Sequence, residues 1–401
     1  MNDPHHDVLS DDPALRIAAL AALRKLHPRP PCRGTNTHVH TNYSFSVFRS
    51  PAEAAWLAYQ AGVEVFGIND HYTIDGHDEF RQACDALGLP ATFSIEAVAM
   101  DRAAAEAGTL LNDPGNPGRM YLCGKGVTRP EHPQAEEHLI QLRRFQEVRN
   151  QAMIAACDRH FRAVLQVTGP QWAEVVSQTP RGNTTERHIA RACVNRIRQL
   201  AEEPGRSFAE LFTALVGAAP AGDDAALQNQ WRGSLLKAGK ACYVDEDERA
   251  YPDLEELCGL FLQLGAIPTY PVLGNPITDG EASISDLCDR LAERGIYALE
   301  LIPERNSDDR VDAVIAEARR RNWPVFDGTE HNTPAMSDLL PQWSCDDRFR
   351  PTFRESALIL LGHQELRRRQ EPGYVDDDGV PEPGGFQRCR SVGAALLDQM
   401  G

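Results

Sequence analysis

The chain has 401 residues, and 41 Lys and Arg against 58 Asp and Glu give it a formal net charge of −17. This length suits one large α/β barrel with insertions, or two to three average domains of about 150 residues. Hydrophobic residues make up 42% of the chain, so we expect a sizeable core and no global disorder. The acidic balance argues against binding polymeric nucleic acid or an anionic membrane, because the field of the protein would repel both. A small phosphorylated substrate remains compatible if cations inside the site reverse that field locally.

The sequence carries no sign of export or of a membrane span. Its ten cysteines include no C-x-x-C pair, which is typical of reduced cytosolic thiols. The first residues are polar and acidic, unlike a signal peptide, and no apolar stretch approaches the roughly 20 residues that a span needs. We therefore expect a cytoplasmic protein, and the sequence does not predict its oligomeric state.

The chain begins with a predicted amphipathic helix over residues 12–27, with Asp12 as its N-cap. Ser50 and Glu53 then form a capping box that opens a second helix, which Gly62 ends. Strands precede and follow this helix, so the segment is a βαβ unit. In all, strands are expected at residues 35–40, 63–68, 91–98, 120–123, 266–272, 296–301 and 324–326. Their alternation with helices predicts a parallel barrel or a doubly wound sheet.

The alternation is interrupted once, by a long stretch that reads as mostly helical. We therefore divide the chain into an N-terminal helical arm (residues 1–31), the first part of a barrel (32–134), a helical insertion (135–250), the second part of the barrel (251–340) and a C-terminal extension (341–401).

Metal-ligand side chains gather where the predicted strands end. His38 and His40 are two residues apart, so in an extended strand they share a face. The ends of later strands carry Asp70 with His71, Glu96, and Glu330 with His331. Each occurrence has an ordinary alternative, since a His pair can be hydrogen-bonded at the surface and Asp-His can cap a turn. In a parallel barrel, however, the carboxyl ends of the strands converge on one rim, and imidazole with carboxylate suits Zn, Mn or Fe. The pattern therefore predicts a metal site.

Several of these segments resemble motifs of the polymerase and histidinol phosphatase (PHP) family. THVHTNYS at residues 37–44 resembles the opening H-x-H-T-x-x-S signature, and INDHYT at 68–73 resembles the second motif. SIE at 94–96 resembles the motif whose Glu bridges metals, and ERHIARA at 186–192 is similar to an Arg-x-His-Ile-Ala stretch. GTEH at 328–331 resembles the last motif, usually Gly-Ser-Asp-x-His.

This resemblance implies a distorted (β/α)7 TIM-like barrel that binds up to three metal ions and hydrolyses phosphoesters. The metal ligands that it and the strand-end pattern indicate are His38, His40, His71, Glu96, His188, Glu330 and His331. For His188, a phosphate contact or a merely polar position in the insertion is an open alternative.

The departures from the family pattern bear on the number of metal ions. Tyr121 and Tyr270 stand where the family usually has His, and Glu330 stands where it usually has Asp. The last motif also lacks a spacer, which leaves His331 or Asn332 at the usual His position. We therefore expect one or two divalent ions rather than three. Either phenol could instead donate a hydrogen bond to a phosphate oxygen.

The expected mechanism uses metal-bound water. One ion would be held by His38, His40, Glu96 and Glu330 and would lower the pKa of bound water toward about 7, which makes hydroxide available at neutral pH. A second ion would lie near His71 and His331, and Asp70 would orient a ligand imidazole. Besides the two tyrosines, the candidate phosphate-binding residues are Lys125, Arg187 and Arg305, for which a solvated surface position is the alternative.

Three functions remain open at this point. The first is a phosphoesterase acting on a small phosphorylated metabolite or nucleotide. The second is an amidohydrolase-type hydrolase, because a metal-bound hydroxide also attacks carbonyl groups. The third is a degenerate barrel that binds a phosphoester without hydrolysing it. The convergence of so many ligand-type side chains argues against the third, because a scaffold does not need them.

Overall fold

The computed structural model describes residues 3–179, 182–274, 276–302 and 305–400. Its centre is one seven-stranded sheet in the order β1-β2-β3-β4-β5-β6-β7. The sheet curves until β7 lies beside β1, where Val39 bridges to Glu330 and Thr35 donates to the Asp327 carboxylate. The strands are β1 (Gly34–Val39), β2 (Val63–His71), β3 (Ala91–Met100), β4 (Arg119–Lys125), β5 (Ile267–Val272), β6 (Leu299–Leu301) and β7 (Val325–Asp327). The predicted distorted barrel is thereby confirmed, and the open doubly wound alternative is excluded.

The strand directions differ from an all-parallel barrel at one place. β4 runs antiparallel to both β3 and β5, whereas the other neighbouring pairs are parallel. The connection from β3 to β4 contains only the short helix α5 (Arg102–Glu106). A parallel return needs a longer crossover, usually a full helix, so this connection brings β4 back in the opposite direction.

The register of the central strands aligns the side chains that matter for function. His71 pairs with Glu96 across β2 and β3, and Glu96 pairs with Cys123 across β3 and β4. Three potential ligands on consecutive strands therefore lie at one level of the sheet.

Helices cover the outside of the barrel, and their ends follow the local signals. The Asp12 side chain accepts from the Ala14 N–H, and the Ser50 side chain accepts from the Glu53 N–H at 3.1 Å. Gly62 ends its helix with a φ of 78°, a left-handed conformation that suits glycine. The N-terminal arm and the barrel include α1 (Pro4–Asp7), α2 (Pro13–Leu26), α3 (Pro51–Ala61), α4 (His77–Leu87), α11 (Leu254–Gln263), α12 (Ile284–Glu293) and α13 (Asp308–Arg321).

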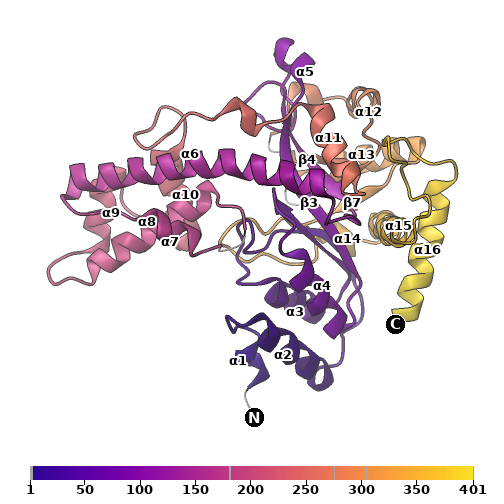
Figure 1. Cartoon of the computed structure of the whole chain (residues 1–401), viewed down its shortest axis with the longest axis horizontal. Helices are drawn as coiled ribbons and strands as arrows, with labels where there is room; N and C mark the ends of the chain where they lie inside the picture. The colour runs from indigo at the N-terminus through magenta and orange to yellow at the C-terminus, as the bar shows by residue number, and fades with distance from the viewer. Residues whose placement is uncertain (1–2, 180–181, 275, 303–304, 401) are drawn as a thin grey trace.

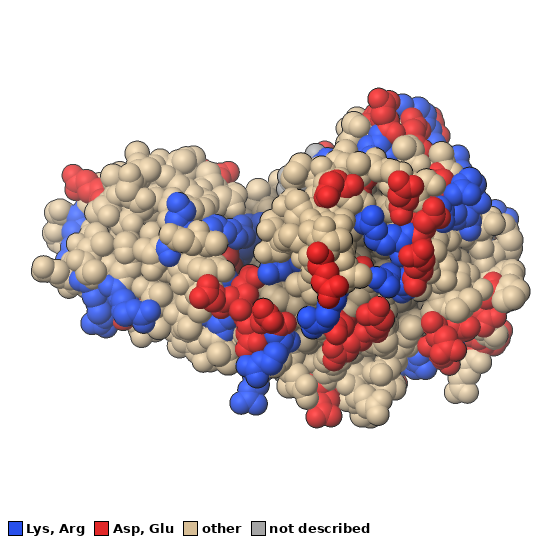
Figure 2. Space-filling view, turned by 90° about the horizontal axis from the view of Figure 1, so that it is seen from above, with Lys and Arg blue, Asp and Glu red and all other residues tan. Residues whose placement is uncertain are grey.

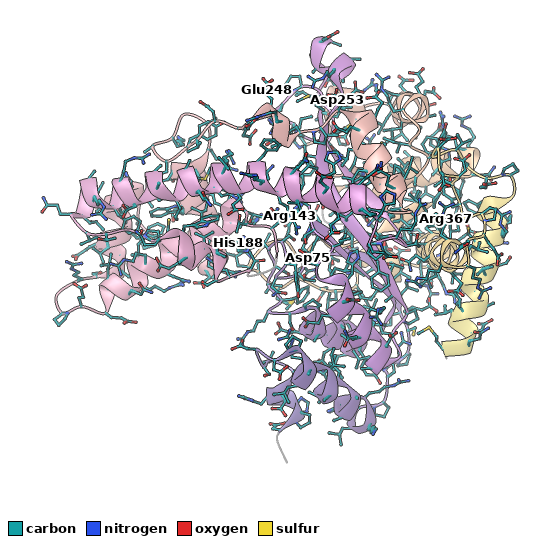
Figure 3. The ribbon with its side chains drawn as sticks, viewed as in Figure 1. Asp75, Arg143, His188, Glu248, Asp253 and Arg367 are labelled. Carbon is teal, nitrogen blue, oxygen red and sulfur yellow. The ribbon has the colours of Figure 1, made fainter. Side chains whose placement is uncertain are left out.

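The segment between β4 and β5 extends to one side of the barrel as a helical region (Figure 1). A hydrophobic cluster that includes Phe161, Phe212 and Trp231 packs inside it, separate from the main barrel core. The longest helix of this region, α6 (Pro133–Leu165), contacts the barrel through an ion pair of 2.6 Å between Arg143 and Asp75, two residues labelled in Figure 3. The helices are α6 (Pro133–Leu165), α7 (Trp172–Val176), α8 (Glu186–Ala201), α9 (Phe208–Val216), α10 (Asp224–Trp231) and the π-helix η1 (Arg232–Leu236).

The C-terminal residues form a helical pair against the barrel. After α14 (Gln342–Cys345), α15 (Arg350–Arg368) packs on β1 and β7, and α16 (Gly385–Met400) packs on α15. A Cβ on Gly362 would lie 1.8 Å from the Cys389 carbonyl oxygen, so only glycine allows this approach of the two helices. Within the described ranges, every helix is too short or too polar to cross a membrane.

Candidate metal centre

Two histidines of the first strand project to the same side, into the barrel. His38 lies in β1 and His40 follows its last residue, so the two share a face as alternate residues do. Their Nε2 atoms lie 3.1 Å apart, and both side chains are buried.

Glu96 of β3 lies at the centre of the cluster. Its Oε2 is 3.3 Å from Nε2 of His38, 3.3 Å from Nε2 of His40 and 3.8 Å from Nδ1 of His71. This oxygen is buried and has no hydrogen-bond partner among the described residues. A buried carboxylate oxygen without a donor is unfavourable, and a cation between it and the imidazoles would remove the penalty. The side chains present therefore fit a metal ion.

The potential ligands form two groups that share Glu96. One group is His40, His71 and Glu96, and the other is His38, Glu96 and Cys123; within each, one ligand atom from every residue lies within 4.8 Å of the others. Imidazole and carboxylate suit Mn, Fe or Zn, and a thiolate adds preference for Zn or Fe. The sequence pattern missed Cys123, although a cysteine at the same level as Glu96 in a buried strand was a signal that could have found it.

Burial and charge set the protonation of these groups. Burial lowers the pKa of His40 and that of His71 to about 4, so both rings are neutral near pH 7 and each offers a nitrogen lone pair. Burial alone would raise the pKa of Glu96, but the charge of His71 and the close approach of the His38 and His40 rings hold that pKa well below its usual range. His40 and His71 thus present neutral imidazoles beside an ionised carboxylate, the forms that bind a cation.

A second carboxylate, that of Glu300 in β6, contacts the His38 ring. Its Oε2 lies 2.9 Å from Nδ1 of His38, and its Oε1 is paired with Lys125. Burial opposes the ionised form of Glu300, yet Lys125 and His38 together hold its pKa at about 2. Burial likewise opposes the charged form of His38, but the Glu300 charge together with hydrogen bonds to Cys123 and Glu300 outweighs it and raises the pKa. Lys125, expected to bind phosphate, is instead fully buried and pairs with Glu300.

Asp70 reaches the cluster through a hydroxyl group. The hydroxyls of Thr41 and Ser44 each donate to its carboxylate at 2.6 Å, and the Ser44 Oγ lies 3.2 Å from Nδ1 of His40. Because Ser44 gives its proton to Asp70, its oxygen accepts from the Nδ1–H of His40. This bond selects the tautomer in which Nε2 of His40, the atom facing Glu96, is unprotonated.

Three predicted ligands lie outside the two donor groups. His331 is held by the loop after β7, with Nδ1 2.7 Å from the Thr329 hydroxyl and Nε2 3.1 Å from the Ser337 carbonyl. Both of its nitrogens therefore have protein partners.

The other two predicted ligands are His188 and Glu330. His188, in the first turn of α8, accepts from the Thr185 N–H at 3.0 Å. Glu330 forms a bidentate pair with Arg305, at 2.6 and 3.2 Å. Glu330 thus has both carboxylate oxygens engaged, and His188 has its Nδ1 engaged.

The centre opens into a cavity of about 370 Å³ between the barrel and the insertion. His71 and Glu96 lie in its wall together with Tyr121, Arg187 and Arg305, three of the predicted substrate-binding residues. Tyr270 is buried elsewhere, because its hydroxyl donates to Glu281 at 3.1 Å. The insertion supplies one further arginine to the wall, Arg232, which the sequence pattern did not indicate.

The insertion is attached to the loop that follows β1, close to the centre. The Asn183 N–H donates to the Tyr43 carbonyl at 2.6 Å, and Arg191 donates to the Ser46 carbonyl and lies over the Phe45 ring. From above, the insertion and the barrel form two lobes with a notch between them, and Lys and Arg side chains lie beside this notch (Figure 2).

The fold resembles solved structures of two hydrolases. One is described as a "putative metal-dependent phosphoesterase" from Bifidobacterium adolescentis, with a TM-score of 0.56 and 18% identity over 81% of this chain and 97% of that one. The other is an amidohydrolase from Chromobacterium violaceum with bound sulfate and no metal, with a TM-score of 0.53 and 17% identity over 80% of this chain and 95% of that one. No protein-family model and no curated protein sequence matches the chain. At these identities the likeness shows a shared fold.

Proposed function

We propose that the protein is a metal-dependent hydrolase that cleaves phosphoesters of small molecules. The observation that carries this proposal is the single cavity in which His71 and Glu96 face Arg187, Arg232 and Arg305. In a chain with a net charge of −17, arginines around a buried cluster of metal-binding side chains favour an anionic ligand at this place. The shared fold with a structure described as a metal-dependent phosphoesterase supports the same proposal.

The arginines are not equivalent. Arg232 is paired with Glu186 at 2.8 Å and Arg305 with Glu330, whereas Arg187 has no ion pair among the described residues. Burial and the nearby charge of Arg232 lower the pKa of Arg187 to about 10, which still leaves it charged at neutral pH. Arg187 is therefore the first candidate to bind a phosphate oxygen, since an unpaired guanidinium gains most from an anion.

Two further residues contribute to orienting a substrate. Burial raises the pKa of Tyr121, so its hydroxyl remains a hydrogen-bond donor toward the cavity. Asp70, acting through Ser44, fixes the direction of the His40 ring. A bound divalent ion would supply Lewis-acid stabilisation of the phosphoryl oxygens and would lower the pKa of water. The surrounding side chains bind the ester and limit the access of bulk solvent.

The decisive experiment removes the two histidines of β1. The double variant His38→Ala/His40→Ala should lose bound metal, measured by elemental analysis, and at least about 1,000-fold of the phosphoesterase kcat/KM. The matched control is His6→Ala, because the His6 side chain is 87% exposed and lies in the N-terminal arm. Full metal content and activity in the double variant would refute the proposed centre.

An amidohydrolase is the second candidate, and the shared fold with the Chromobacterium violaceum amidohydrolase favours it. The two candidates differ in the bond that is cleaved. Chelated protein should be reloaded with Mn(II), Fe(II) or Zn(II) and assayed against phosphomonoesters and, in parallel, against N-acyl amino acids and cyclic amides. Release of inorganic phosphate alone supports the first candidate, and release of amine or carboxylate alone replaces it with the second.

A further inference from the structure

A second and larger cavity adjoins the first. It measures about 790 Å³ and is lined mainly by the segment between β7 and α14. Arg305, Glu330 and Asn332 belong to the walls of both cavities, so the two spaces meet at these three side chains. A volume of this size suits an organic group of several rings.

The chemistry of the second cavity differs from that of the first. Its formal charges balance, because Arg33 is matched by Asp338 and Arg305 is paired with Glu330. The Trp343 indole N–H donates to Asp308 at 3.1 Å, so the ring contributes mainly its apolar surface. Apolar side chains of the wall include Ala61, Ile302, Leu339, Leu340, Pro341 and Trp343, and much of the remaining wall is polar, for example Thr333, Ser337 and Gln342.

The wall between the two cavities has an unusual backbone conformation that side-chain contacts stabilise. Glu330 and His331 both have positive φ, 57° and 54°, a conformation that side chains other than glycine rarely adopt. His331 holds it from within the loop through Thr329 and Ser337, and Phe48 stacks on the His331 ring. Strained residues of this kind cluster at functional sites, so these two consecutive ones beside the candidate site support a functional role for this loop.

We propose that the second cavity binds the organic part of the phosphoester while the arginines of the first cavity bind its phosphate. The substrate class is then a phosphate ester of a bulky, uncharged, partly aromatic alcohol. His331 is a positioning residue that maintains the wall of this subsite. This inference rests on the proposed function for its kinetic test, and it has a binding test that does not depend on turnover.

The kinetic test varies the alcohol while keeping its acidity nearly constant. Ethyl, benzyl and 2-naphthylmethyl phosphate present the same phosphate on alcohols of similar pKa and increasing apolar size. For the metal-loaded protein, kcat/KM should rise at least about tenfold from the ethyl to the naphthylmethyl ester, mainly through a lower KM. Equal kcat/KM values for the three esters would overturn the subsite.

Two tryptophan substitutions in the same loop distinguish the effect of filling the cavity from a general effect of changing the loop. Ala335 is exposed and lines the cavity, whereas its neighbour Met336 is 52% exposed and does not line it. Ala335→Trp should raise KM for the naphthylmethyl ester about tenfold and leave the ethyl ester unchanged, and Met336→Trp should change neither. The proposal fails if Ala335→Trp affects the three esters alike or affects none of them.

The binding test uses 2-naphthylmethanol alone, without phosphate. Saturation-transfer NMR should detect its binding to the wild type and to Met336→Trp, and at least severalfold weaker binding to Ala335→Trp. If no phosphoester is hydrolysed but this pattern holds, the proposed function fails and the subsite stands. If hydrolysis is found but the alcohol binds equally to both variants, only the subsite is refuted.

Discussion

The interior of the barrel and the core of the insertion differ in what they bury. The barrel encloses ionisable groups at almost no exposure, including His38, Glu96, Lys125 and Glu300. The cluster inside the insertion consists of apolar side chains and cysteines, with Phe161, Phe212 and Trp231 as its largest members. Burying apolar groups stabilises a fold, whereas burying charges is favourable only when each charge is closely matched. The contrast therefore assigns the chemistry to the barrel and a mainly architectural role to the interior of the insertion.

The largest effect on stability is expected where the barrel interior loses one charge of a pair. Lys125→Met removes the cation paired with Oε1 of Glu300, leaves only His38 beside this buried carboxylate, and should lower the free energy of unfolding by about 3–5 kcal/mol. Adding Glu300→Gln should restore most of this loss, because no uncompensated charge then remains. For comparison, Ile197→Val in the insertion core should lower it by only about 1 kcal/mol. Urea unfolding of the chelated proteins gives all three values, and a small effect of Lys125→Met would remove the basis of the contrast.

The sequence predicted the parts of the structure that depend on local signals. Strand positions and the caps at Asp12, Ser50 and Gly62 follow from a few neighbouring residues, and the structure confirms them. The antiparallel direction of β4 was missed, because it depends on the length of the connection rather than on the strand itself.

Within the candidate centre, the structure brings His38, His40 and His71 close to Glu96, each of the three at or next to the end of a strand, whereas Glu96 lies in the middle of β3 because that strand continues to Met100. Glu300 escaped notice, although a carboxylate between two leucines in a short strand was a usable signal. Lys125, Tyr270 and His331 were assigned to substrate or metal from their positions next to motifs. In the structure, Lys125 pairs with Glu300 and Tyr270 donates to Glu281, while His331 contacts the Ser337 carbonyl in the folded loop. These contacts depend on the tertiary fold, which the motifs do not contain. The position of Arg232 depends on how the insertion packs against the barrel, which no local pattern contains.

Acid should destabilise the protein through its buried histidines, and His363 is one that lies apart from the candidate centre. His363 of α15 is buried, donates from Nε2 to the Gly265 carbonyl at 2.9 Å and accepts the Tyr374 N–H at Nδ1 at 3.0 Å. Burial lowers its pKa to about 4, below the value of about 6.5 in an unfolded chain. The unfolded state therefore binds more protons between these values, so this stabilisation is complete above about pH 6.5 and is lost as the pH falls toward 4, by about 3 kcal/mol in total.

This expectation is tested by the pH dependence of unfolding. His363→Gln keeps a side-chain amide able to donate to Gly265 but cannot be protonated, so the slope of the free energy of unfolding between pH 6.5 and 4 should decrease by about 1 kcal/mol per pH unit. The comparison should use the chelated protein, because metal binding to the other histidines also depends on pH. An unchanged slope would mean that His363 does not titrate in this window.

The smallest predicted effect is the one that could break the contrast between the two regions, because it concerns a functional residue of the insertion. Arg232 lines the first cavity and is paired with Glu186, and Lys237 is paired with the same carboxylate at 2.8 Å but is absent from the cavity wall. Arg232→Met should raise KM for a phosphomonoester about tenfold with little change in kcat, since it removes a charge that acts on the bound substrate and the transition state alike. Lys237→Met removes a charge from the same network and should leave KM within about twofold. Equal effects of the two substitutions would mean that they act through Glu186 and not through the substrate. A large effect of Arg232→Met alone would mean that the insertion, despite its apolar core, completes the anion site that the barrel begins.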